Sequence, residues 1–253
     1  MKTERPFIYI AGLQRTCSTL LQELLTEKGK CFFFHEPWFG TGLFENHKTS
    51  IKMLDEWGLS GEVLLDPNVS LPIMFLRLSK VIPQIGIKEI RHQGWEMYLN
   101  LFDDIRWIVL VREPRDIYVS SHYFLQRTDV WKPRFPPFSP KGLFQELQPD
   151  IERQVEIYRT QPHSIRIRYE DFAVDQENIW NARRFAGSEV ATADSVGSFH
   201  KRIGRGNYET ELHGGVITGK QINRWERETD IELISNFNEF YELMKDYREY
   251  WNY

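Results

Sequence analysis

The chain has 253 residues, of which 41% are hydrophobic and 27% charged, and its formal net charge at pH 7 is −4. This is the composition of an ordinary globular protein with room for one sizeable core, and we predict a single domain over residues 1–253. The negative charge argues against general attraction to nucleic acid or anionic lipid. No apolar run approaches the roughly 20 residues that a membrane helix needs, and the two cysteines, Cys17 and Cys31, fit a reducing compartment. We therefore expect a cytoplasmic protein without a membrane span or a nucleic-acid partner.

Short apolar runs alternate along the chain with segments of helical spacing. Strands that are nearly all apolar are typical of parallel sheets, which are buried on both faces. The pattern predicts an α/β fold with a central parallel sheet flanked by helices. The predicted strands are Ile8–Ala11, Phe32–Phe34, Ile85–Ile87, Trp107–Val111 and Ile165–Arg168, and the predicted helices are Ser18–Glu27, Trp95–Phe102, Pro114–Leu125, Gly142–Arg159 and Asn178–Phe185, with loops at residues 131–140 and 197–219.

The first predicted strand runs into the loop GLQRTCST, residues 12–19, and then into a helical pattern. Amide groups at a helix amino terminus carry partial positive charge, so a strand, loop and helix in this order can bind a phosphate. A nucleoside-triphosphatase loop would read G-x-x-x-x-G-K-[ST], and the second glycine and the lysine of that pattern are missing here. We predict a P-loop-like turn that holds a phosphate through Gly12, Arg15, Thr16, Cys17, Ser18 and Thr19.

Several of these residues have a plainer interpretation. Ser18 and Thr19 are residue types that cap helices, a role that is compatible with phosphate contact. Arg15 is alternatively a solvated surface arginine. A cysteine at a helix amino terminus can act as a nucleophile, and for Cys17 this is the interpretation that we favour least.

The second informative stretch is IRWIVLVREPRDIYVSSHYF, residues 105–124. A buried strand ends at Arg112, Pro114 suits the first turn of a helix, and Ser120 lies along that helix. Because parallel sheets bind ligands beyond the carboxyl ends of their strands, Arg112 should reach the same edge as the loop. Its guanidinium can bond two phosphate oxygens at once, and a serine hydroxyl can add a third bond. The alternative is that Arg112 pairs with Glu113 or Asp116 and that Ser120 only packs.

Taken together, the two stretches resemble the sulfotransferases that use 3′-phosphoadenosine 5′-phosphosulfate (PAPS). The resemblance implies that the loop Gly12–Leu21 holds the 5′-phosphosulfate, with Arg15 in the place of the family's lysine or arginine. It also implies that Arg112 and Ser120 hold the 3′-phosphate, that 3′,5′-adenosine bisphosphate (PAP) is the product, and that no metal is needed. The missing P-loop lysine fits this donor, which has no β,γ-phosphates.

Two further segments resemble the family less specifically. IRYEDF, residues 167–172, is similar to a strand-end segment whose tyrosine, here Tyr169, faces the adenine. TGKQINRWERE, residues 218–228, is similar to a late loop that covers the 3′-phosphate, which adds Gly219 and Lys220 to the implied donor site and places the tryptophan of that pattern at Trp225.

Sulfuryl transfer to an alcohol also needs a base near the acceptor oxygen. His35 and Glu36 follow the second predicted strand, and Lys88 and Glu89 follow the third. The resemblance implies a glutamate at about the position of Glu36 in many family members and a histidine near Lys88–Glu89 in others. We predict Glu36 as the base, with His35 as a second candidate and an ion pair or a helix cap as the alternative for Glu36. The catalytic candidates are thus Arg15, Glu36 and His35.

The function that these residues favour is transfer of a sulfuryl group from PAPS to a hydroxyl, or as a second choice an amine, of a small or medium-sized acceptor. Two alternatives stay open: a P-loop nucleotide kinase or hydrolase, and a non-catalytic nucleotide-binding protein. The histidines lack metal-site spacing, so no metal is expected. An apolar or sugar-stacking acceptor pocket is suggested by the aromatic residues Trp38, Phe39, Phe44, Tyr123, Phe124, Trp131, Phe135 and Phe138.

Overall fold

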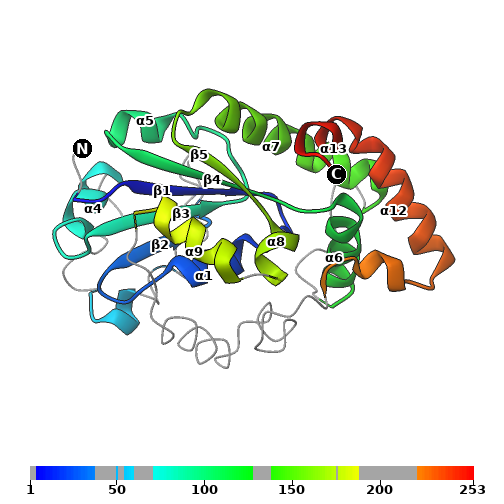
Figure 1. Cartoon of the computed structure of the whole chain (residues 1–253), viewed down its shortest axis with the longest axis horizontal. Helices are drawn as coiled ribbons and strands as arrows, with labels where there is room; N and C mark the ends of the chain where they lie inside the picture. Colours follow the sequence, from blue (N-terminus) through cyan, green and yellow to red (C-terminus); the bar gives the residue numbers. More distant parts are fainter. Residues whose placement is uncertain are drawn as a thin grey trace.

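The computed structural model describes residues 4–37, 50, 54–59, 71–127, 138–174, 176–187 and 221–253. Within them, five parallel strands form one sheet in the order β2-β3-β1-β4-β5 (Figure 1). The predicted α/β fold is therefore confirmed, and each predicted strand is present and extends by one to three residues. The strands are β1 (Phe7–Gly12), β2 (Cys31–His35), β3 (Gln84–Glu89), β4 (Ile105–Val111) and β5 (Ser164–Arg168).

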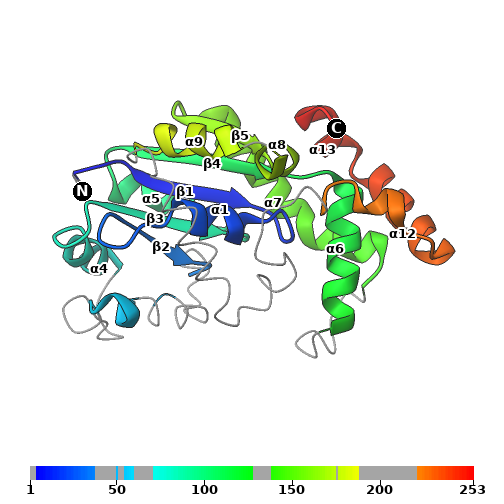
Figure 2. The same cartoon turned by 60° about the horizontal axis from the view of Figure 1, so that its bottom comes forward.

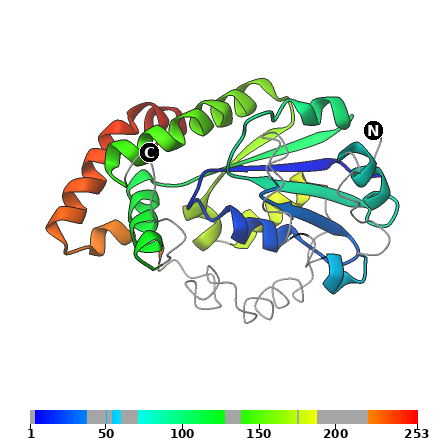
Figure 3. The same cartoon turned by 180° about the vertical axis from the view of Figure 1, so that it is seen from behind.

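Helices cover both faces of the sheet (Figures 1 and 3). One face carries α1 (Ser18–Leu25), α8 (Tyr169–Val174) and α9 (Gln176–Phe185), and the other carries α4 (Leu71–Leu78), α5 (Met97–Leu101) and α7 (Pro140–Thr160). At the carboxyl end of the sheet stand α6 (Pro114–Arg127), the 3₁₀ helix η4 (Arg224–Arg227), α12 (Ile231–Leu243) and α13 (Lys245–Trp251) (Figure 2). None of the helices described is long and apolar enough to cross a membrane.

Alternation along the strands divides the core into two layers, because successive strand side chains point to opposite faces. Tyr9, Phe34 and Trp107 pack into the layer under α4, α5 and α7. Ile10 and Phe33 pack into the layer under α1 and α9. Both layers are buried, which explains why the strands read as nearly continuous apolar runs.

The helix boundaries differ from the prediction where local geometry overrides the apolar spacing. Helix α1 ends at Leu25, not at Glu27, because Thr26 is extended and Glu27 forms a bridge to Cys31. Helix α7 begins at Pro140, which the proline-rich pattern had put in a loop, because the Ser139 hydroxyl accepts from Gly142 N at 3.0 Å and proline suits a first helical position. Helices α4, α8, α12 and α13 were not predicted.

The strand register brings the chemically important residues to one edge. His35 of β2 pairs with Lys88 of β3, Ala11 of β1 pairs with Glu89, and Gly12 pairs with Leu110 of β4. Residues that follow these strands therefore emerge side by side, in the spatial order β2, β3, β1, β4, β5.

Candidate functional site

The last two carbonyl groups of β1, where the chain enters the loop to α1, both meet side-chain donors. The Ala11 carbonyl accepts from Gln154 Nε2 of α7 at 2.8 Å. The Gly12 carbonyl lies 3.0 Å from His92 Nε2, on the segment that follows β3. Both donors are fully buried, so these contacts fix the direction in which the strand leaves the sheet.

Further along the loop, the carbonyls are again turned toward protein donors. The Leu13 carbonyl accepts from the Thr16 hydroxyl at 2.8 Å and from Thr16 N at 3.3 Å. The Arg15 carbonyl accepts from Arg112 Nη1 at 2.8 Å. Acceptors that are already satisfied in this way do not project their negative ends toward an anion, which leaves the loop electrostatically suited to phosphate.

The first turn of α1 adds a second favourable element. Its N-cap residue is Cys17, whose side chain makes no capping hydrogen bond, and the helical ladder starts with Leu21 N donating to the Cys17 carbonyl at 3.2 Å. The amides of Ser18, Thr19 and Leu20 therefore precede the ladder, where the positive end of the helix dipole lies. Ser18 and Thr19 are thus the first helical residues and not the cap.

Arg112 is 3% exposed and lies against the loop on the α1 side of the sheet. Its Nη2 donates to the Gln221 carbonyl at 3.0 Å and lies 3.8 Å from Asp116 Oδ2, and its guanidinium carbon stands 4.3 Å from the centre of the Tyr169 ring. Burial alone would lower the pKa of Arg112, but the neighbouring Cys17 and Asp116 outweigh it, so that the pKa is raised. Arg112 Nε is buried and has no hydrogen-bond acceptor in the part of the chain that the structure describes.

Arg15 reaches from the loop to α6. Its Nε donates to the Ser120 hydroxyl at 3.1 Å, and its guanidinium carbon stands 4.5 Å from the centre of the Phe124 ring. The structure thus brings Arg15, Ser120 and Arg112 together, although more than 90 residues separate the loop from α6. Arg15 is not a solvated surface arginine, and Ser120 does more than pack.

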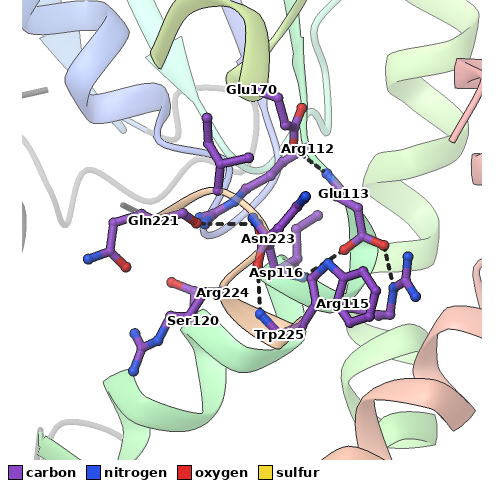
Figure 4. A network of polar contacts seen from close by, with 12 residues as sticks. Arg112, Glu113, Arg115, Asp116, Ser120, Glu170, Gln221, Asn223, Arg224 and Trp225 are labelled. Carbon is purple, nitrogen blue, oxygen red and sulfur yellow. Dashed lines mark hydrogen bonds and ion pairs between the residues drawn. The ribbon is translucent and has the colours of Figure 1, made fainter. Parts of the chain in front are cut away.

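Asp116 holds the segment that follows residue 220 against α6 (Figure 4). Its Oδ2 accepts from Asn223 N at 2.9 Å and its Oδ1 from Trp225 N at 3.3 Å. Burial raises the pKa of Asp116, against the opposing effects of Arg112 and of these amides. Of the two alternative partners considered for Arg112, Asp116 lies 3.8 Å from its Nη2, while Glu113 accepts from Arg115 Nε at 2.6 Å.

On the other side of the loop, Glu36 pairs with a buried lysine. Lys88 Nζ, which is 0% exposed, donates to Glu36 Oε1, and Glu36 N donates to the Lys88 carbonyl at 2.8 Å. His35 Nε2 lies 3.9 Å from Glu36 Oε1, and His35 Nδ1 is 2.8 Å from Gln22 Oε1 of α1. Glu89 is buried and follows Lys88 along β3, so the two side chains point to opposite faces of the sheet. On its own face, the charge of Glu89 raises the pKa of Tyr98, next in effect to the burial of that phenol.

Backbone strain is concentrated at these same residues. In the described chain, the non-glycine residues with positive φ other than asparagine are Arg15 (66°), Cys17 (65°) and Glu36 (44°). Each such conformation costs about 1–3 kcal/mol and persists only where surrounding contacts hold it. Strain of this kind is characteristic of functional sites, because a relaxed loop would aim its groups elsewhere.

Of the other candidate residues, Tyr169 lies under Arg112 at the start of α8. The guanidinium carbon of Arg115 stands 3.4 Å from the centre of the Trp225 ring. Gly219 and Lys220 lie outside the described residues, as do Trp38, Phe39, Phe44, Trp131 and Phe135. Phe138 packs on Tyr118, and the Tyr123 hydroxyl donates to Glu228 at 2.8 Å, so only Phe124 among the described aromatic candidates is placed here at Arg15.

Three residues that matter for this geometry were not predicted as site residues: His92, Asp116 and Gln154. His92 ends the stretch GIKEIRH, residues 86–92, which also contains Lys88 and Glu89, but its partner Gly12 is 80 positions away. Asp116 stands in the first turn of α6, where an acidic residue is ordinary, and its amide partners lie more than 100 positions further on. The described residues include no group of three or more histidine, cysteine or acidic side chains placed to hold a metal ion.

Solved structures share this architecture over nearly the whole chain. The sulfotransferase domain of the curacin biosynthetic pathway matches with a TM-score of 0.67 and 16% identity, covering 96% of this chain and 97% of that one. The sulfotransferase domain of the Synechococcus PCC 7002 olefin synthase matches with a TM-score of 0.62 and 16% identity, covering 97% and 96%. The fold is that of the sulfotransferases.

A mouse sulfotransferase complexed with PAP has the same fold, with a TM-score of 0.54 and 14% identity over 95% of this chain and 85% of that one. No protein-family model matches the sequence, and neither does any curated protein. At identities of 14–16%, the likeness concerns the sulfotransferase fold and not a particular acceptor.

We expect Asp116→Asn to loosen residues 221–227. The amide offers one acceptor oxygen where the carboxylate accepts through both, and the charge facing Arg112 is lost. Stability should fall by roughly 1–3 kcal/mol in urea unfolding, with faster hydrogen exchange in peptides that cover 221–227. Glu226→Gln, which removes an equal charge from the exposed side of η4, should change unfolding by less than about 0.5 kcal/mol. Unchanged exchange in Asp116→Asn would show that Asp116 does not hold this segment.

Proposed function

We propose that this protein transfers a sulfuryl group from PAPS to a hydroxyl group of a small or medium-sized acceptor. The observation that carries the proposal is Arg112: a buried guanidinium that holds the loop by one nitrogen while its Nε has no acceptor among the described residues. A buried donor without an acceptor is costly unless a ligand supplies one. Together with the sulfotransferase fold, this makes an anionic adenosine nucleotide the best-supported ligand.

The residues of the donor side fit two anionic groups. The loop and the first amides of α1 would hold the 5′-phosphosulfate, and Arg112 with Ser120 would hold the 3′-phosphate. Tyr169, packed under Arg112, would face the adenine. Two groups of donors, one for the 5′ position and one for the 3′ position of the ribose, would select a nucleotide that carries phosphate at both positions.

When bound, PAPS supplies an electrophilic sulfuryl group. The side chain of Arg15 extends from the loop to Ser120, where its guanidinium can offset charge on the leaving phosphate oxygen. The positive charge of Arg15 is positioned in advance by Ser120 and Phe124, so little reorganisation is needed when that charge develops.

The acceptor side is formed by the ends of β2 and β3. Glu36 would take the proton of the acceptor hydroxyl, and Lys88 holds its carboxylate in place through Oε1. His35, turned toward Gln22, is a second candidate for this role. Because β1 lies between β3 and β4, the proposed base and the proposed 3′-phosphate residues stand on opposite sides of the loop.

Arg112→Ala should weaken PAP binding by tenfold or more and affect adenosine 5′-monophosphate less, because each charge-assisted hydrogen bond is worth about 1.5–3 kcal/mol. Calorimetry with both ligands, without metal, measures the difference. Arg227→Ala, an exposed arginine nearby, controls for the loss of charge. If Arg112→Ala weakened the binding of both ligands equally, Arg112 would not be the residue that recognises the 3′-phosphate. If the unaltered protein bound ATP with Mg²⁺ but did not bind PAP, a nucleotide kinase would be favoured.

Arg15→Ala should reduce turnover about 10²–10³-fold, as loss of one preorganised donor does in other enzymes, with a smaller effect on PAP affinity. Turnover can be followed as PAP formation from PAPS in the presence of a panel of phenols and primary alcohols. Arg15→Lys keeps the charge and should retain more activity. A rate for Arg15→Ala within a few-fold of the parent would show that Arg15 has no role in the transition state.

Glu36→Gln should lose about 10²-fold or more in rate with PAP binding nearly unchanged, because the amide keeps the shape of the side chain but cannot accept a proton. Urea unfolding should be measured alongside, since the substitution also leaves buried Lys88 without its anion. His35→Asn and Glu89→Gln should cost less activity. A Glu36→Gln enzyme as fast as the parent, beside an inactive Glu89→Gln, would move the base to β3.

A further inference from the structure

His92 is a fully buried histidine to which the roles proposed above assign nothing. It follows β3 and lies beside Tyr9, in the layer that α7 covers. Its Nε2 is 3.0 Å from the Gly12 carbonyl and its Nδ1 is 3.1 Å from the Tyr9 hydroxyl. Its main-chain N donates to Asp150 Oδ1 of α7 at 2.8 Å. Through its ring and its main-chain N, this one residue thus connects the end of β1, the end of β3 and a long helix.

These contacts allow one arrangement of protons. Burial lowers the pKa of His92 to about 4, against a smaller opposing effect of Asp150, so the ring is neutral at neutral pH and carries a single N–H. A carbonyl oxygen can only accept, so this hydrogen must be on Nε2 for the Gly12 contact to be a hydrogen bond. Nδ1 is then the acceptor and the Tyr9 hydroxyl the donor. Burial raises the pKa of Tyr9 well above its usual value, so this phenol keeps its proton.

The Gly12 carbonyl is a sensitive place to hold the loop. In a trans peptide the C=O and N–H groups point in opposite directions, so fixing the Gly12 carbonyl also fixes the direction of the Leu13 amide, the first of the loop. There is little room for adjustment, because a Cβ on Gly12 would come within 2.6 Å of the Ser18 Cβ. A rotation of this peptide would therefore disturb the first turn of α1 as well.

Arg112 and His92 hold the loop from opposite faces of the sheet. Arg112 donates to the Arg15 carbonyl from the side of α1 and α8, and His92 donates to the Gly12 carbonyl from the side of α7. Arg112 should exchange part of its contacts when an anion binds, because it also belongs to the proposed ligand site. His92 is fully buried and belongs to no proposed ligand contact, so it can hold the loop in place with or without the anion.

We propose that His92 is a positioning residue for the candidate donor loop: its Nε2–H fixes the Gly12–Leu13 peptide and thereby aims the loop amides at the anion. The identity of that anion rests on the proposed function, whereas the mechanical part of the inference does not. His92 touches no reacting group in this arrangement and acts only through the backbone.

Two conservative substitutions separate the contacts of the ring. In His92→Gln the side-chain amide reaches the place of Nε2 and can still donate to Gly12. In His92→Asn it reaches only the place of Nδ1, so it can accept from Tyr9 but leaves the Gly12 carbonyl without a donor. Both variants remove the same imidazole, and urea unfolding of each measures how much global stability is lost.

The closing experiment combines hydrogen exchange in peptides that cover residues 12–20 with PAP affinity by calorimetry. We expect exchange in His92→Asn to be about tenfold faster and PAP binding about tenfold weaker than in the parent, with His92→Gln within about threefold on both measures. Equal behaviour of the two variants in loop exchange would overturn the inference. If the parent does not bind PAP, the proposed function fails, and loop exchange still decides the role of His92.

A measurement on the unaltered protein serves if His92→Asn does not fold. The ¹⁵N chemical shifts of the His92 ring at neutral pH should show hydrogen on Nε2 and a bare Nδ1 that accepts a hydrogen bond. A ring protonated on Nδ1, alone or together with Nε2, would overturn the inference.

Discussion

The carbonyl groups at the end of β1 and in the loop that follows it are the feature on which the rest of the site depends. Gln154, His92, Thr16 and Arg112 each donate to one of them, from α7, from the end of β3, from the loop itself and from the end of β4. A single such bond contributes about 1 kcal/mol, but a buried carbonyl left without a donor costs more, so together they select one loop conformation. With the carbonyls turned inward, the amides at the start of α1 remain for a ligand.

The order of the strands divides the carboxyl edge into two halves with different chemistry. On the side of β4 and β5 stands the guanidinium of Arg112, packed on Tyr169. On the side of β2 and β3 stands the carboxylate of Glu36, held by Lys88. A positive half suits a nucleotide with two anionic groups, and a half with a carboxylate suits removal of a proton. Strands β2 and β3 lie on one side of β1, and β4 and β5 lie on the other. Ligands of open α/β sheets bind at such a switch in strand order.

Local patterns were sufficient to predict the sheet and the candidates that follow its strands. Arg15, Glu36 and Arg112 could be placed at one edge because strands buried on both faces are apolar, and because their carboxyl ends coincide in a parallel sheet. Contacts between distant segments could not be predicted in this way. The partners of Asp116 lie beyond residue 220, and nothing in the spacing around His92 indicates that its ring meets Gly12. Helices α12 and α13 were missed for a related reason: aromatic and charged residues are mixed along them, and α12 packs its apolar side against α6 and α7, while Trp251 of α13 packs against Tyr158 of α7.

The absence of a second glycine from this loop makes the carbonyl contacts more important. The P-loop pattern places its second glycine at position 17, yet Cys17 stands there with a φ of 65°, and Arg15 has nearly the same φ. Glycine adopts this conformation at no steric cost, whereas each of these two residues costs about 1–3 kcal/mol. A loop without these two positive-φ residues would therefore be lower in backbone energy. The hydrogen bonds donated from α7, β3 and β4 must offset that energy difference. Strain and anchoring are thus two parts of one arrangement: the anchors hold Arg15 in the strained conformation from which it meets Ser120, and without them its guanidinium would move away from α6.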